Sequence, residues 1–559
     1  MLQKLKYLAG FSLMAGTLFA QPRITELVNG ASYIPTGLPG SGVAQGAIAV
    51  LKGSNLGPAE LIQSGIPRPT TLGGTSIRIS VGGTEVSALM VYSSAAQLAF
   101  VLPSNTPLGN AVARVTYNGQ TSDPYGFTVV RNGPGLFTLN SGGTGPAVLT
   151  NPNFEVLTYT NAAREGEVII AWATGVTGIT TSDADPAPAF DPPIPVEVFI
   201  GGRTANVRYR GRAPGYTGLD QIVFDIPQGV RGCGVSFAMR VGGNLSNFTT
   251  IPVAGPNTRV CSDPNGYPEG TLSNIPAGGL RIGAIELART STKISAAGLT
   301  LDSTADVGAG TFVRFDANSL IRSRGMDSIS YGSCTVFTFR GESNTPDPIQ
   351  PQGLDAGPQL TVTNNSGSKT MQRGQGGSYS GDFGTSIGGL PNLPGGLPNI
   401  PGLPGGGAPA FLDPGTYTVT GPGGADVGPF TARVTIPQGF VWTNQDATTS
   451  VPRGGQGLTV NWNGGNATDY VTVVGLSYRR NPAVGAMFLC SAQNSAKTLR
   501  VPPEVLSALP PSETIEGTPT GFLTVSNSSA VDTGRFNANG LDLGFLGYST
   551  SIAKNVAFE

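Results

Sequence analysis

The feature that most constrains the fold is a pattern of alternating strands and glycine turns that occurs twice, about 120 residues apart. Residues 46–57 run from an alternating apolar strand into a turn containing Gly53, and residues 166–178 do the same with a few extra residues. Residues 77–84 and 196–203 both place apolar side chains at every second position before a Gly-Gly pair. Alternation sends apolar side chains to one face of a sheet, and Gly-Gly supplies the backbone of a tight hairpin.

Two further segments extend the match between the copies. Residues 97–103 and 221–227 both begin with Gln, carry Phe at the fourth place and end in Pro, which closes a strand. Residues 112–119 and 235–243 form the last matching pair. Copies of about seven strands with frequent turn signals are typical of immunoglobulin-like sandwiches.

The rest of the chain keeps the same β texture. We predict an all-β protein of tandem immunoglobulin-like β-sandwiches, with further β-sandwich or barrel domains in the C-terminal half. The expected units are two immunoglobulin-like domains at 22–132 and 133–256, a β-rich domain at 263–439 and a C-terminal immunoglobulin-like β domain at 440–559. A content of Gly 82 and Pro 45 suits tight turns, and 39% apolar residues provide material for the cores.

Three local features of the second half need separate predictions. Residues 388–407 are rich in Pro and Gly but lack glycine at every third place, so they predict a mobile polyproline-like loop rather than collagen. An apolar recognition ridge is the alternative for this loop. Trp442 and Trp462 are interpreted as sheet-packing residues rather than ligand platforms. A short helix is expected at 503–509, opened by one proline and stopped by the next.

The N-terminal residues predict export. Lys4 and Lys6 precede an apolar stretch at 8–19, and Ala20 follows it, which indicates a signal peptide at 1–20. No later segment reaches about 18 consecutive apolar residues, so we expect no membrane span. The predicted location is secreted, extracellular or at the cell surface after removal of the signal peptide.

The four cysteines fit disulfides in an exported chain. Three pairings are possible, and proximity in the sequence favours Cys233 with Cys261 and therefore Cys334 with Cys490, although the second pair falls in different predicted domains. The first bond would be worth roughly 3 to 4 kcal/mol on the chain-entropy model. A zinc site is disfavoured because the cysteines lack CxxC spacing and the chain contains no histidine.

The composition also limits the chemistry. Without histidine, Ser-His-Asp and Cys-His mechanisms cannot form within this polypeptide. Asp183, Asp185 and Asp191 share one proline-rich loop, where two carboxylates could bind calcium or act as acid and base. The simpler interpretation is an exposed loop of solvated acids. A net charge of -1 without a dense basic cluster disfavours nucleic-acid binding.

Several of these motifs together resemble a known family. The turn at 53–57 looks like the opening of IPT/TIG immunoglobulin-like domains. The stretch 22–253 resembles an uncharacterised domain family of exported acidobacterial (Solibacter-type) proteins, through its entry at 29–32, its linker at 134–137 and residues 213–216. The resemblance implies an immunoglobulin-like fold and an exported setting, and it implies no activity.

These observations predict an exported, non-enzymatic binding or structural protein of the cell surface or extracellular matrix. No catalytic residue, metal or cofactor is expected. The partner would be an unknown protein or a polysaccharide. The alternative is a carbohydrate-binding accessory protein or a carboxylate-dependent glycan-active enzyme.

Overall fold

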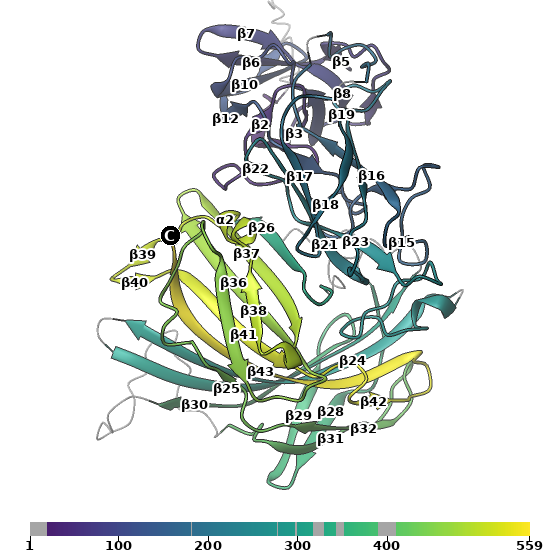
Figure 1. The fold of residues 1–559 in the computed structure, drawn as a ribbon, viewed down its shortest axis with the longest axis vertical. Coiled ribbons are helices and arrows are strands. Elements are labelled where there is room, and N and C mark those ends of the chain that lie inside the picture. The colour runs from purple at the N-terminus through teal and green to yellow at the C-terminus, as the bar shows by residue number, and fades with distance from the viewer. Residues whose placement is uncertain are drawn as a thin grey trace, which may run out of the picture.

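A computed structural model gives the fold of the chain (Figure 1). It describes residues 20–559 apart from 180, 190, 277, 297–298, 317–328, 342–350 and 389–409. The predicted signal peptide at 1–20 and Pro/Gly loop at 388–407 lie outside the described residues, save for one terminal residue of each. The described chain is almost entirely β. Its helical elements are α2 (Pro503–Ser507), where a short helix was predicted, and the 3-10 turns η1 (Leu272–Asn274) and η3 (Asn494–Ala496).

The first sandwich consists of two sheets. One contains, in spatial order, β1 (Arg23–Asn29), β3 (Ile48–Ser54), β9 (Gln97–Val101), β8 (Leu89–Ser93) and β4 (Ile62–Gln63). The other contains β2 (Val43–Ala44), β12 (Tyr125–Val130), β10 (Gly109–Tyr117), β6 (Thr75–Val81) and β5 (Thr71–Leu72), with β11 (Gln120–Thr121) on β10 and β7 (Thr84–Ser87) on β6.

The second sandwich repeats this arrangement. One sheet contains β13 (Gly135–Leu136), β16 (Val168–Thr174), β20 (Asp220–Asp225) and β19 (Val207–Arg212), with β14 (Leu149–Thr150) also on β16. The other contains β15 (Ala163–Arg164), β23 (Thr249–Ala254), β21 (Gly232–Val241), β17 (Val196–Ile200) and β18 (Arg203–Ala205), with β22 (Asn244–Leu245) on β21.

The main strands of the two sandwiches correspond, while the short strands β4, β5 and β14 occur in only one of them. In the first, β2 pairs parallel with β12 beside otherwise antiparallel strands, and β15 pairs parallel with β23 in the second. Each sandwich has its own core, one built from residues between Leu27 and Val129 and the other from residues between Leu136 and Val253. The sequence repeat is therefore a structural repeat, and the predicted fold class of tandem immunoglobulin-like sandwiches is confirmed.

The C-terminal half is dominated by one large sheet, drawn in teal to yellow in Figure 1. Its main path contains β26 (Cys334–Arg340), β37 (Ala483–Gln493), β36 (Tyr470–Arg480), β41 (Gly521–Ser528), β43 (Leu543–Phe558), β24 (Leu280–Ala296), β25 (Leu299–Phe315), β30 (Ser378–Gly388), β29 (Gly367–Arg373), β28 (Gln359–Asn364), β31 (Gly415–Gly421) and β32 (Phe430–Ile436). The short strands β27 (Gln352–Gly353), β34 (Ser450–Val451) and β42 (Arg535–Phe536) pair at its sides. Two small sheets complete this half: β33 (Val441–Trp442), β35 (Leu458–Asn463) and β38 (Thr498–Val501), and β39 (Thr514–Ile515) with β40 (Thr518–Pro519).

The large sheet crosses the division predicted at 439/440. Strand β26, from the first of the two predicted domains, pairs with β37 of the second, and β24 pairs with the C-terminal strand β43. Most residues of the two main cores nevertheless separate near that division. The sheet also curls back on itself. Its last strand, β32, reaches β42, which pairs with β43 in the middle of the sheet, and Phe430 of β32 stacks on Phe536 of β42 with ring centroids 4.6 Å apart. Pairing between strands so distant in sequence leaves no local signal, which explains why the sequence showed two units rather than a shared sheet.

Trp442 and Trp462 lie in one of these cores and are 2% and 1% exposed, as their interpretation as packing residues requires. No helix in the described part of the chain is long and apolar enough to cross a membrane.

Candidate binding surface on the second sandwich

The acidic loop between β16 and β17 forms part of the contact between the sandwiches. Asp183 is buried, and its carboxylate accepts hydrogen bonds from the Ser104 backbone N–H at 2.6 Å and the Ser104 hydroxyl at 2.8 Å. Ser104 belongs to the first sandwich. The interpretation of Asp183 as a solvated acid is therefore wrong. Local sequence does not reveal this contact, because Asp183 and Ser104 lie 79 positions apart in the chain. Burial raises the pKa of the Asp183 carboxyl, while the Ser104 hydrogen bonds and nearby Arg212 oppose that rise.

A buried ion pair strengthens the same contact. Arg212 and Asp220 are each 1% exposed, with Nη1 and Oδ1 3.2 Å apart. Arg212 also donates to the Gly46 carbonyl of the first sandwich at 3.1 Å and to the Thr177 carbonyl at 2.9 Å. We call Asp183, Arg212 and Asp220 the interdomain clamp. Because Asp183 and Arg212 both bond to groups of the first sandwich, the clamp fixes the position of one sandwich on the other.

The other two acids of the loop are not drawn into this contact. Asp185 is exposed, and Asp191 is about half exposed, 3.3 Å from the Arg210 guanidinium. Among the residues that the structure describes, no group of three or more Asp, Glu or Cys side chains is placed to hold a metal ion. The interpretation as exposed surface acids therefore applies to Asp185 and Asp191.

The cysteines pair as the sequence favoured. Cys233 bonds to Cys261, and Cys334 bonds to Cys490. Cys334 and Cys490 lie directly opposite each other on neighbouring strands of one sheet, which removes the difficulty of their separate predicted domains. With these two bonds, all four cysteines of the chain are accounted for.

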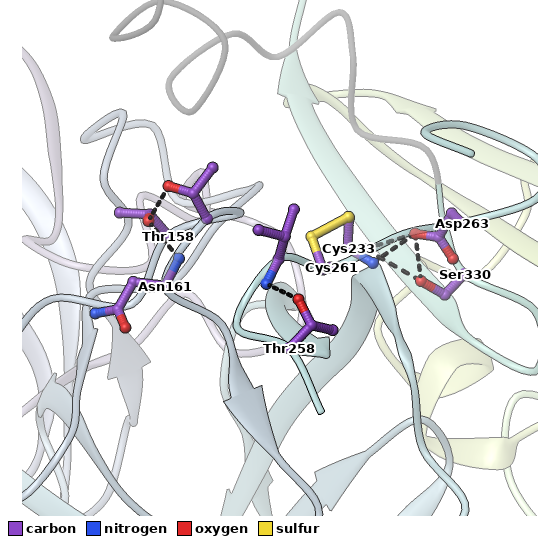
Figure 2. Close-up of a disulfide and its surroundings, with 10 residues drawn as sticks. Thr158, Asn161, Cys233, Thr258, Cys261, Asp263 and Ser330 are labelled. Atoms are coloured by element: carbon purple, nitrogen blue, oxygen red, sulfur yellow. Dashed lines mark hydrogen bonds between the residues drawn. A yellow bond between two sulfur atoms is a disulfide. The ribbon is translucent and has the colours of Figure 1, made fainter. Parts of the chain in front are cut away.

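A buried carboxylate sits beside the first disulfide, at the contact between the second sandwich and the C-terminal half (Figure 2). Asp263 accepts hydrogen bonds from the Cys233 N–H at 2.5 Å, the Gly234 N–H at 3.2 Å and the Ser330 hydroxyl at 3.0 Å. Burial raises the pKa of Asp263 to about 6, even though all three hydrogen bonds lower it. Asp263 therefore titrates in a mildly acidic range.

A cleft of about 580 Å³ lies at this same contact, between the second sandwich and α2. Beside it, Arg240 connects two of its lining residues: the guanidinium lies 5.1 Å from the Phe199 ring centroid and 3.3 Å from Glu504. These contacts join the two bodies on either side, so the cleft is an interdomain junction.

A different part of the second sandwich brings together three aromatic rings, of which two are exposed and the central one, Trp172, is partly buried. Trp172 lies on β16 between Ala171 and Ala173, which point into the core, so its own side chain lies on the outer face of the sheet. Its ring centroid is 6.2 Å from that of Phe154 and 6.4 Å from that of Tyr216. Phe154 is 63% exposed and Tyr216 is 52% exposed. We call these three residues the ring platform.

The turn before Phe154 holds its ring in place. The Asn151 side-chain oxygen accepts hydrogen bonds from the N–H groups of Asn153 and Glu155, each at 3.0 Å. Phe154 itself donates to the Asn151 carbonyl and has a φ of +62°, in the left-handed region that bulky residues rarely adopt. The turn thus keeps a large apolar side chain in solvent with a strained backbone, and neither property stabilises the fold.

Tyr216 is positioned by the hairpin loop between β19 and β20. Its carbonyl accepts a hydrogen bond from the Ala187 N–H of the acidic loop. Gly218 anchors the loop against the first sandwich: it has a φ of +67°, and a Cβ there would lie 2.8 Å from Ile48 and Val101 side-chain atoms. Only glycine fits this position. The ring platform and the sandwich contact therefore share one loop.

The ring platform was not predicted from the sequence. A usable signal was present, because the aligned copies place Lys52 of the first sandwich where the second has Trp172. Both residues sit opposite a glutamine of the neighbouring strand, Gln97 and Gln221. A lysine in one copy marks a solvent-facing position, so a tryptophan in the other copy predicts an exposed ring.

Comparison with known proteins adds little to this description. No protein-family model and no curated protein matches the chain. Among solved structures, the plexin A4 extracellular region is 12% identical over 40% of this chain, with a TM-score of 0.14, and the chain spans 17% of that protein. The SGBP-B protein of the Bacteroides ovatus mixed-linkage glucan utilization locus, in complex with a heptasaccharide, is 11% identical, with 83% and 84% of the two chains covered and a TM-score of 0.13. Immunoglobulin domains 1–4 of Sidekick-1 are 11% identical, with 92% and 98% covered and a TM-score of 0.10. With TM-scores this low, the similarities carry no argument about function.

Proposed function

We propose that the chain is an exported, non-enzymatic binding or structural protein of the cell surface or extracellular matrix, and that the ring platform is its binding surface. The observation that carries this proposal is the exposure of Phe154 from a left-handed backbone, in contact with Trp172. Exposed aromatic side chains held rigidly by their surroundings are typical of recognition surfaces, because they offer large contact areas at little cost in conformational entropy.

Two further observations support the proposal. The interdomain clamp joins the sandwiches through buried groups, so the platform is carried on a rigid support. Two disulfides are typical of proteins from an oxidising compartment, as the predicted signal peptide and the resemblance to exported IPT/TIG-like domains also imply. Membership of that family is part of the proposal.

Co-sedimentation tests this function. Purified protein is incubated with the insoluble extracellular matrix of a producing culture and centrifuged. We expect the unmodified protein and the control variant Lys52→Ala to sediment with the matrix, whereas Trp172→Ala stays in the supernatant. Equal sedimentation of the two variants would show that the ring platform is not the binding surface.

A further inference from the structure

We propose that the ring platform binds a neutral polysaccharide chain, with sugar rings stacking on Trp172 and Phe154. This inference rests on the proposed binding role of the platform and names the class of ligand. The C–H groups on one face of a pyranose ring form an apolar surface that packs on an aromatic ring, while the hydroxyl groups around its edge stay available for hydrogen bonds.

The arrangement of the rings suits an extended ligand. The Phe154 and Trp172 rings are tilted by 35° at a centroid separation of 6.2 Å, so together they form a gently bent floor. Tyr216 stands edge-on to Trp172, with an interplanar angle of 69°, and forms a wall. A row of rings with Trp172 in the middle supports neighbouring units of one chain, whereas an aromatic cage for a single cation needs rings that surround one point.

Polar groups beside the rings match the edge of a sugar. Gln221 lies directly opposite Trp172 on β20, on the same face of the sheet, and its other neighbour in register is Gly211 of β19. Gly211 has no side chain that could hydrogen-bond to the amide of the partly buried Gln221. Asn153, exposed in the turn before Phe154, presents a second amide. A primary amide offers donors and an acceptor together, which suits adjacent hydroxyl groups.

Two unpaired carboxylates near the platform favour a neutral chain over an anionic one. Glu155 is exposed beside Phe154, with its carboxylate hydrogen-bonded to the Asn151 amide at 2.7 Å. Asp185 is exposed in the loop that contacts Tyr216. Neither carboxylate has an ion-pair partner among the described residues, and both repel uronic acids and sulfated sugars. The neighbouring cation Arg68 is bonded to the Thr217 hydroxyl at 2.9 Å, so it is already engaged by the loop that carries Tyr216.

Isothermal titration calorimetry on the full chain tests the inference. The probes are cellohexaose, mannohexaose and xylohexaose as neutral chains, polygalacturonate as an anionic chain, and decaproline as a peptide that also packs on aromatic rings. We expect at least one neutral hexasaccharide to bind, Trp172→Ala to weaken it by about tenfold or more, and Lys52→Ala to leave the affinity unchanged. Trp172→Phe keeps a smaller stacking ring and is expected to bind with intermediate affinity.

The outcomes separate this inference from the proposed function. If no neutral sugar binds while matrix sedimentation still depends on Trp172, the polysaccharide assignment is overturned and the binding function stands. Binding of decaproline or polygalacturonate that depends on Trp172 overturns the assignment in the same way. If neither sugar binding nor sedimentation depends on Trp172, both proposals fail. New reducing ends released from a bound sugar would contradict the non-enzymatic role.

Discussion

The two sandwiches share one topology but differ at the same outward-facing strand position. In the first sandwich this position holds Lys52, which pairs with Glu26 at 2.9 Å and lies 5.1 Å from the centroid of the Tyr33 ring. In the second it holds Trp172, which contacts Phe154 and Tyr216. Inward-facing positions are apolar in both copies. The inward-facing residues of these strands therefore specify the shared fold, whereas the proposed binding surface depends on an outward-facing position that differs between the copies.

Each sandwich also contains one aromatic residue with a left-handed backbone, and these two residues differ in their burial. Tyr33 has a φ of +51°, and burial raises its pKa to about 12, with nearby Tyr92 and Glu26 contributing to the rise. Its strain is therefore offset by packing in the first sandwich. Phe154 has a φ of +62° and is 63% exposed, so packing does not offset its strain. An energetic cost that is retained without a gain in stability points to function.

The largest loss of stability is expected from a substitution that breaks the rigid connection between the sandwiches. Arg212→Leu leaves Asp220 buried without its charge partner, so we expect the free energy of unfolding to fall by about 3 to 5 kcal/mol. Denaturant unfolding measures this loss. The matched control is Arg208→Leu, which removes an exposed pair with Asp225 and should cost less than about 1 kcal/mol. Equal losses in the two variants would contradict the clamp.

The next prediction concerns a contact that only the second sandwich makes, in which Asp263 is buried between this sandwich and the C-terminal half. The pKa of Asp263 is raised from 3.8 to about 6 in the folded chain. Between these values the folded state keeps a proton that the unfolded state releases, so stability falls as pH rises through this window. The contribution is fully present below pH 3.8 and lost above about pH 6, and it amounts to roughly 3 kcal/mol.

Unfolding measured from pH 4 to pH 7 tests this pH dependence, with Asp263→Asn as the control. Asparagine resembles the protonated carboxyl, because it keeps an acceptor oxygen for the Cys233 N–H and carries donors of its own. The unfolding free energy of the Asp263→Asn variant should therefore lack the part of the pH dependence that Asp263 contributes. An identical pH profile for the variant and the unmodified chain would show that Asp263 does not titrate as described.

A substitution that makes the outer faces of the two sandwiches alike should have a smaller effect on free energy. Trp172→Lys gives the second sandwich the side chain of the first, and we expect ligand affinity to fall about tenfold, which corresponds to about 1.4 kcal/mol. Stability should fall by about 1 kcal/mol, because Trp172 is partly buried and its indole N–H donates to the Thr150 hydroxyl at 3.3 Å. Calorimetric titration and thermal unfolding measure the two quantities. A large loss of stability with unchanged affinity would make Trp172 a structural residue.

The smallest effect concerns the strain at Phe154. Phe154→Gly relieves the left-handed backbone, so the free energy of unfolding should stay the same or rise by up to about 1 kcal/mol, while ligand affinity falls. Phe154→Ala is the matched comparison, because it removes the ring and keeps the strain. A marked loss of stability in the glycine variant alone would mean that the turn needs the ring for folding.

The repeat made much of the fold predictable, and non-local contacts account for what was missed. Strand alternation fixed which side chains enter the two cores, and sequence proximity favoured the Cys233–Cys261 pair. The Asp183 contact with Ser104 was missed because it joins two sandwiches, and the β26–β37 pairing was missed because it joins segments far apart in the chain. The ring platform was missed for a different reason. Phe154 and Tyr216 lie in loops, whose convergence on Trp172 has no sequence period.

Fluorescence quenching tests most directly whether the outer face of the second sandwich is the binding surface. The chain has three tryptophans, and Trp442 and Trp462 are only 2% and 1% exposed, so an aqueous quencher such as iodide should reach Trp172 selectively. The account predicts that a saturating ligand of the chain removes the quenchable fraction, and that Trp172→Phe lacks this fraction from the start. Binding that leaves the quenching of Trp172 unchanged would contradict it.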